Sequence, residues 1–105
     1  MNEGRIVRYY FEWDPKKARN NLKKHKVSFE RALSIFLDPH AITIFDEEHS
    51  EREDRWITMG IDRIGILLVA VHTFQQINNE KYKIRIISTR KATRKETKQY
   101  REENI

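Results

Sequence analysis

The stretch that decides the fold is residues 82–100, Tyr82-Lys-Ile-Arg-Ile-Ile-Ser-Thr-Arg-Lys-Ala-Thr-Arg-Lys-Glu-Thr-Lys-Gln-Tyr100. Apolar side chains stand at every second position from Tyr82 to Ile86, and this period of two predicts a β-strand. Thr93 and Glu96 then have the spacing of a capping box, which predicts the start of a polar, charged helix. Rigid elements hold guanidinium groups in place for bidentate contact with phosphate. The junction therefore predicts a phosphate-handling site built from five cations: Arg85, Arg90, Lys91, Arg94 and Lys95.

The remaining elements follow from capping residues and apolar spacing. Asp14-Pro15 has the pattern of an N-cap followed by a first-turn proline and predicts a helix over 15–25. Apolar residues at i, i+3, i+4, i+7 and i+8 from Phe29 predict a second, amphipathic helix, which ends at Asp38-Pro39. Further strands are predicted at 8–13, 41–45, 55–61 and 66–74, and a polar loop at 75–81.

The predicted order β-α-α-β-β-β-β-α indicates an α+β fold with a mainly antiparallel sheet and helices packed on one side. The strand at 66–74 is the most apolar stretch and is predicted to be central, covered on both faces. The length of 105 residues suits a single domain over 1–105 with one modest core.

Composition excludes several classes of protein. The chain has no cysteine, which excludes a disulfide framework and a thiolate zinc site. No apolar run approaches the ~20 residues that cross a bilayer, and residues 1–8 lack the apolar centre of a signal peptide. We therefore expect a cytoplasmic protein without membrane contact.

The net charge of +5 hides a strong segregation. Residues 15–26 carry six basic side chains and no acid, whereas residues 46–54 carry six acids and one arginine. Residues 80–105 carry nine basic and four acidic side chains. Two basic blocks separated by an acidic one predict a surface that faces a polyanion and a distinct surface of opposite sign. The alternative is that the charged helices are solvated faces that keep a small domain soluble.

Several pieces of sequence, taken together and in order, resemble the BrnT family of bacterial toxins over nearly the whole chain. These pieces are Phe11-Glu-Trp-Asp14, Lys17-Ala18, Asn21, Lys24-His25, Val27-Ser-Phe29, Glu51, Glu53, Arg55, Gly60, Arg85-Ile-Ile-Ser-Thr-Arg-Lys-Ala92, Glu96 and Tyr100. The chain departs from the family pattern at Lys26, where glycine is common, and at Thr89, where alanine is common.

This resemblance implies a RelE-like fold and an endoribonuclease that arrests growth by cleaving RNA. It also implies a cognate antitoxin of the BrnA type, a ribbon-helix-helix protein that neutralises the toxin. Operator DNA would be bound through that antitoxin, in the complex. The family pattern has no agreed set of catalytic residues. The candidate site residues are therefore chosen by the chemical groups that RNA cleavage requires.

RNA cleavage without a metal uses the 2′-hydroxyl as nucleophile and needs a base, an acid and cations that stabilise the charged phosphorane. Arg85 and Arg90 are the candidate cations. Arg85 is predicted to lie on the strand face away from the core, where an ion pair with Glu53 is the alternative. Arg90 closes the strand, and its alternative role is to cap a helix.

His25 is the candidate general acid or base, because an imidazole exchanges protons near neutral pH. Its alternative role is to complement the dipole at a helix C-terminus. Glu53 and Arg55 are two residues apart and so lie on one face of a strand, where Glu53 is a second candidate base. The alternative there is an exposed ion pair of little energetic value.

The candidate RNA-binding side chains are Lys24, Lys91, Arg94, Lys95 and Tyr100. Tyr100 can stack on a base or donate to a phosphate, and core packing is its alternative role. No cofactor is expected. Asp46, Glu48 and His49 carry atoms suited to a hard cation but lack a spaced ligand motif, so we interpret them as a solvated loop and expect no metal. His72, within an apolar strand, is interpreted as a core histidine.

Two other functions fit the charge distribution. One is a non-catalytic nucleic-acid-binding module, and the other is a structural subunit whose basic surface binds an acidic partner. Expression without a partner separates them, because only a toxin is expected to stop growth.

Overall fold

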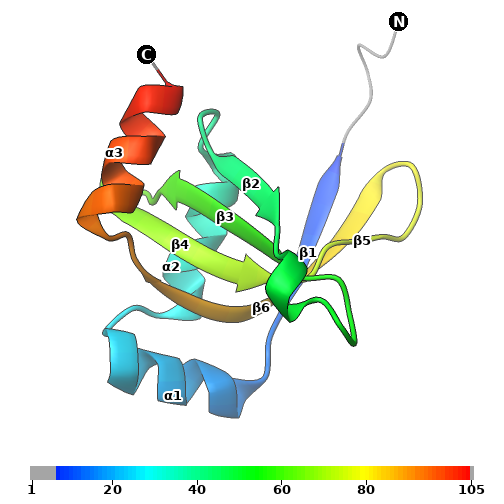
Figure 1. Ribbon diagram of the computed structural model, residues 1–105. Coiled ribbons are helices and arrows are strands. Elements are labelled where there is room, and N and C mark those ends of the chain that lie inside the picture. The colour runs from blue at the N-terminus through cyan, green and yellow to red at the C-terminus, as the bar shows by residue number, and fades with distance from the viewer. Residues whose placement is uncertain (1–6, 105) are drawn as a thin grey trace, which may run out of the picture.

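The computed structural model describes residues 7–104 and contains the predicted elements with small shifts at their ends (Figure 1). The strands are β1 (Arg8–Glu12), β2 (Ile42–Phe45), β3 (Trp56–Ile61), β4 (Leu67–His72), β5 (Gln75–Gln76) and β6 (Lys81–Lys91). The helices are α1 (Pro15–His25), α2 (Phe29–Leu33) and α3 (Arg94–Glu103), with 3₁₀ turns η1 (Ser34–Leu37) and η2 (Glu47–His49). In this described part, no helix is long and apolar enough to cross a membrane.

The sheet is mainly antiparallel, as predicted, with the order β1-β6-β4-β3-β2. The β1–β6 pair is parallel, and β4 is the central strand. The prediction of a polar loop at 75–81 was wrong at both ends, because Gln75–Gln76 form β5, which pairs with β6, and Lys81 is the first residue of β6. Asn78 Oδ1 accepts hydrogen bonds from the backbone N–H groups of Glu80 and Lys81, at 2.9 and 3.0 Å. This side chain closes the turn and lets the two strands meet.

The helix boundaries follow their caps. Asp14 accepts a hydrogen bond from Lys16 N at the start of α1, and Thr93 and Glu96 form the predicted capping box of α3. Lys26, at the end of α1, has a φ of 60°, the left-handed conformation that favours glycine. This explains why a glycine at this position suits the family pattern.

The predicted second helix is divided into α2 and η1. Ser34 Oγ donates to Arg31 O at 2.9 Å and accepts from Arg63 N at 3.0 Å, which ties the break to the turn after β3. The tighter turn brings Ile35 against Gly60, where a Cβ atom would lie 2.9 Å from Ile35 O. Gly60 is therefore required by close packing.

The hydrophobic core lies between α2–η1 and one face of the sheet. Val27, Ala32 and Ile35 pack against Leu68 and Ala70 in one buried cluster. A second cluster joins Phe29 to the strand residues Ile84 and Ile86. Each large apolar side chain buried here contributes about 1.5–3 kcal/mol.

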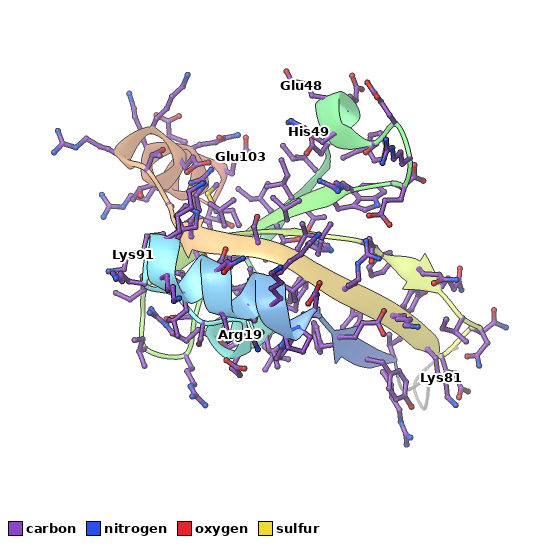
Figure 2. The ribbon with its side chains drawn as sticks, turned by 90° about the horizontal axis from the view of Figure 1, so that it is seen from below. Arg19, Glu48, His49, Lys81, Lys91 and Glu103 are labelled. Carbon is purple, nitrogen blue, oxygen red and sulfur yellow. The ribbon has the colours of Figure 1, made fainter. Side chains whose placement is uncertain are left out.

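The opposite face of the sheet, which we call the open face, carries Ile57 of β3, Val71 of β4 and Ile87 and Ser88 of β6. The register shifts between Val71 and His72, so that Ile87 is the extra residue of a β-bulge. Figure 2 shows α1 on one side of β6, and α3 and η2 on the other. The prediction of helices on one side only was therefore wrong, because α3 turns back over the open face.

Candidate active site on the open face of the sheet

A groove runs over the open face beneath the loop that joins β2 to β3. Its inner part is a cavity of about 350 Å³ lined by residues of that loop and by the open face: Asp46, Glu48, His49, Arg55, Ile57, Val71, Ile87 and Ser88. A neighbouring cavity of about 400 Å³ shares Glu48, His49 and Arg55 and reaches Glu53. A third, of about 240 Å³, contains both Glu53 and Arg85. The cavities share lining residues and so adjoin one another, and we call the three together the groove.

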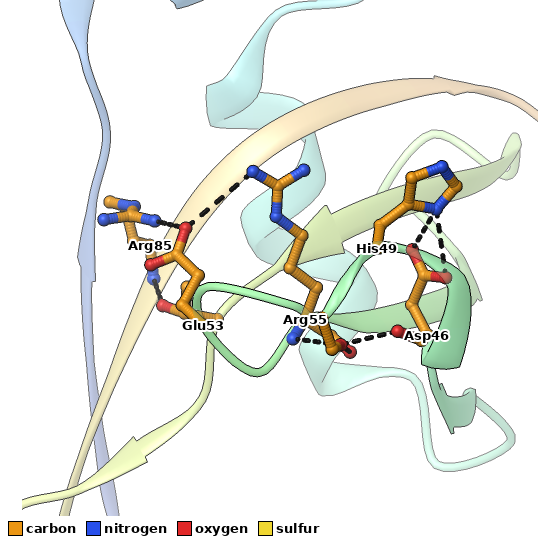
Figure 3. Close-up of polar contacts among 7 residues, drawn as sticks. Asp46, His49, Glu53, Arg55 and Arg85 are labelled. Atoms are coloured by element: carbon orange, nitrogen blue, oxygen red, sulfur yellow. Dashed lines mark hydrogen bonds and ion pairs between the residues drawn. The ribbon is translucent and has the colours of Figure 1, made fainter.

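Glu53 joins the two arginines of the groove (Figure 3). Its Oε1 accepts a charge-assisted hydrogen bond from Arg85 Nη2 and lies 3.9 Å from Arg55 Nη2. All three side chains are about one third exposed. Two guanidinium groups therefore share one carboxylate, and the carboxylates of Asp46, Glu48 and Glu51 line the same groove.

Arg55 is the less satisfied of the two cations. Its Nε atom is buried and has no hydrogen-bond partner among residues 7–104. Arg85, by contrast, donates to Glu53, and its backbone N–H donates to Thr73 Oγ1 at 3.1 Å. A buried donor without a partner costs free energy. The Arg55 side chain as a whole is 32% exposed, so its guanidinium can contact an anion in the groove.

The loop is held closed by Ser50. Its hydroxyl donates to the carbonyl of Asp46 and accepts from Arg55 N at 3.0 Å, while Asp46 N donates to Arg55 O at 2.9 Å. The Asp46 carboxylate accepts from His49 Nδ1 at 3.0 and 3.2 Å. Asp46 is 11% exposed and His49 is 63% exposed, so the buried carboxylate orients an accessible imidazole. These contacts were missed because Asp46 and His49 meet only when the chain curls into η2.

The acidic block does not form the separate surface that the charge pattern predicts. Glu53 reaches across to Arg85 on β6, and Asp46 and Glu48 line the same groove as Arg55. The acidic residues belong to the loop that leads into β3, and β3 begins at Trp56 beside the central strand β4. The loop therefore lies over the middle of the sheet, where its carboxylates meet cations. The ion pair of Arg85 with Glu53 is the alternative that the sequence left open.

Arg90 is engaged elsewhere. It makes a bidentate pair with Glu96 of α3, with Nη1 to Oε1 at 2.7 Å and Nη2 to Oε2 at 2.9 Å. These hydrogen bonds lower the pKa of Glu96 to about 2 and raise the pKa of Arg90. Because Glu96 also accepts from Thr93 N, Arg90 stabilises the start of α3, as its alternative role proposed. The geometry favours this structural role over a catalytic one.

His25 lies at the end of α1, on the core side of β6 (Figure 2). No hydrogen bond or ion pair within residues 7–104 joins it to Glu53, Arg55 or Arg85. The structure therefore does not bring this histidine into the groove. The sequence predicted the helix but not the side of the sheet against which it packs.

The predicted RNA-binding lysines and arginines lie beyond the groove. Lys24, Lys91, Arg94 and Lys95 are exposed, and Figure 2 shows Lys91 at the end of β6, beside the end of α1 and the start of α3. We call these four residues the basic end. Lys91 is six residues from Arg85 along the strand, a separation of about 20 Å. The five cations predicted to share one junction are thus divided among the groove, the Glu96 pair and the basic end.

Tyr100 anchors α3. Its hydroxyl donates to Asp38 Oδ2 at 2.6 Å. Burial, together with this hydrogen bond to the carboxylate, raises the pKa of Tyr100 to about 12. The hydroxyl is therefore occupied, which leaves only the ring for contact with RNA.

His72 is a core histidine, as predicted. It is buried, its Nδ1 donates to Thr73 O at 2.8 Å and its Nε2 accepts from Thr58 Oγ1 at 2.7 Å. Burial lowers its pKa, which keeps the ring neutral. Within residues 7–104, no group of three or more His, Cys, Asp or Glu side chains is arranged to hold a metal ion.

Fold and groove together define a small α+β protein that presents paired guanidinium groups and an oriented imidazole on an open sheet face. Residues 13–96 match the model of a family described as the ribonuclease toxin, BrnT, of type II toxin–antitoxin systems. The chain belongs to this BrnT toxin family. The matched residues include Asp46, His49, Glu53, Arg55 and Arg85. The family resemblance predicted from the sequence is thus confirmed.

Comparison with solved structures finds the crystal structure of the Brucella abortus ribonuclease toxin BrnT, which is 23% identical. The alignment covers 86% of this chain and 97% of that chain, with a TM-score of 0.49. Comparison with curated proteins gave no match.

Proposed function

We propose that this chain is the toxin of a toxin–antitoxin pair, an endoribonuclease that arrests growth by cleaving RNA in the groove of the open face. The observation that carries the proposal is the pair of guanidinium groups, Arg55 and Arg85, that share the Glu53 carboxylate in the groove. Their side chains are 32% and 39% exposed, so a scissile phosphate in the groove can reach them. The membership of a ribonuclease toxin family supports RNA as the substrate.

The reaction proposed is attack of the 2′-oxygen on the adjacent phosphorus, with cleavage of the bond from phosphorus to the 5′-oxygen. Arg55 and Arg85 stabilise the extra negative charge that the phosphorane carries relative to the phosphodiester. Glu53 holds the two guanidinium groups in register, because its Oε1 faces both. The basic end binds the backbone further along the strand, through contacts that carry no base specificity.

We expect this cleavage to proceed without an added metal, since guanidinium and imidazole groups supply the charge and proton transfer that the reaction needs. Purified protein should cleave a single-stranded RNA in EDTA at the rate seen in magnesium. Gel analysis of an end-labelled RNA measures this directly. Loss of cleavage in EDTA with recovery in magnesium would contradict the metal-free mechanism.

The same assay distinguishes an endoribonuclease from a non-catalytic nucleic-acid-binding module. The exposed basic end supports this alternative. Such a module would retard RNA in a binding gel without cutting it, and its expression alone would be tolerated. A toxin is expected to arrest growth in the cytoplasm when expressed without its partner. We also propose that the fold is RelE-like and that residues 1–105 form one toxin domain.

The partner proposed is a BrnA-type ribbon-helix-helix antitoxin, with operator DNA bound by the complex through the antitoxin. We expect an acidic or amphipathic segment of this partner to cover the basic end, in the place of RNA. Titrating purified antitoxin into the cleavage assay should abolish cleavage at equivalence, and Lys91→Glu with Lys95→Glu should weaken the complex. Full inhibition through contacts confined to the 46–54 loop would contradict this occlusion.

A further inference from the structure

His49 and Asp46 form an oriented acid–base pair at the groove. The Nδ1 atom of His49 lies 3.0 Å from Asp46 Oδ2, and a carboxylate can only accept, so Nδ1 carries the proton. Nε2 then presents a lone pair, and no group within residues 7–104 hydrogen-bonds to it. His49 also lines both cavities that Arg55 lines. Figure 3 shows the imidazole beside the Arg55 side chain.

We propose that His49 is the general base of RNA cleavage and that Asp46 is its positioning residue; this assignment rests on the proposed ribonuclease function. Nε2 takes the proton of the 2′-hydroxyl while the 2′-oxygen forms its bond to phosphorus. The bond from phosphorus to the 5′-oxygen breaks, and that oxygen takes a proton from water in the open groove. The products are a 2′,3′-cyclic phosphate and a 5′-hydroxyl, and the imidazolium returns its proton to solvent.

Three features favour His49 over the bases predicted from sequence. The Oε1 atom of Glu53 faces two guanidinium groups, so this oxygen is engaged. His25 is the last residue of α1, and α1 lies on the other side of β6 from η2 (Figure 2). The carboxylate of Asp46 is nearly buried beside His49 Nδ1. There it stabilises the imidazolium that forms when Nε2 takes the proton of the 2′-hydroxyl.

Several charged groups surround His49 in the groove. Those lining the same cavities are Asp46, Glu48, Glu51, Arg52, Glu53 and Arg55. A base must be unprotonated to act, so the single-turnover rate should rise with pH on the acidic limb of its profile. That limb should disappear when the imidazole is removed.

The test is single-turnover cleavage of a defined single-stranded RNA by wild-type protein and variants. His49→Ala should lower the rate about 100- to 1,000-fold, abolish the acidic limb and leave the RNA dissociation constant within about threefold. Added imidazole should restore part of the lost rate, which a merely structural role would not allow. Asp46→Asn should lower the rate by about tenfold or more while keeping a base. His40→Ala, an exposed histidine outside the groove, is the matched control.

The outcomes separate the two proposals. Wild-type protein that binds RNA but never cuts it would overturn the ribonuclease function and this assignment with it. Wild-type cleavage retained in folded His49→Ala would overturn the assignment alone. Loss and imidazole rescue in His25→Ala instead would place the base on α1 and also overturn it.

Discussion

Replacing Arg55 with alanine is expected to lower the rate of RNA cleavage by about 100- to 1,000-fold, with the fold intact. Its buried Nε lacks a partner, and its Nη2 lies 3.9 Å from a carboxylate already bonded to Arg85. The side chain is 32% exposed, so a phosphorane, whose charge exceeds that of the substrate, can reach the guanidinium. The loss should fall mainly on the rate of bound RNA rather than on binding.

Arg55→Lys should recover only part of the rate, because an ammonium keeps the charge but lacks the planar fork. Arg85→Ala should also slow cleavage, since Glu53 would then pair with Arg55 alone and neutralise it. Single-turnover kinetics and growth on expression measure these effects. Arg19→Ala, which removes an exposed arginine from α1 on the far side of β6 (Figure 2), should behave as wild type. Folded Arg55→Ala and Arg85→Ala variants that remain fully toxic would refute this role.

The largest expected loss of stability comes from Asn21, a residue of α1 that completes the edge of β6. Its Oδ1 accepts from Thr89 N at 3.1 Å, and its Nδ2 donates to Thr89 O at 2.8 Å and to Val27 O at 3.0 Å. β1 pairs with β6 only as far as Arg85, so this side chain replaces a neighbouring strand. Asn21→Ala leaves three buried backbone groups without partners.

Each such group costs about 1–3 kcal/mol, so we expect Asn21→Ala to lower the free energy of unfolding by at least about 3 kcal/mol. That is a large part of the 5–15 kcal/mol typical of a small domain. Urea unfolding followed by circular dichroism measures the change. Asn20→Ala, an exposed neighbour on the same helix, should change stability by less than about 0.5 kcal/mol. A loss below about 1 kcal/mol in Asn21→Ala would show that water replaces its bonds.

The helices and strands can be predicted from the sequence because each is specified by residues close together along the chain. Asp14-Pro15 and the Thr93–Glu96 box set helix starts through side chains two and three residues from the groups they cap. The alternation around Ile84 and Ile86 assigns the buried face of β6. The same alternation correctly predicts that Arg85 points away from the core. Family membership was predicted from several short sequence motifs that occur in the family's order, and the family model confirms it.

The candidate site depended on geometry that no local pattern contains. The side of the sheet on which α1 packs removes His25 from the groove, and the angle between β6 and α3 brings Glu96 to Arg90. His49 joins the site only because the 46–55 segment closes through Ser50 and turns Asp46 toward it. The sequence by itself determined the elements, the buried face of β6 and the family. Tertiary structure alone decided which charges meet, because a pairing across elements depends on their relative orientation, and side-chain spacing along the chain does not encode it.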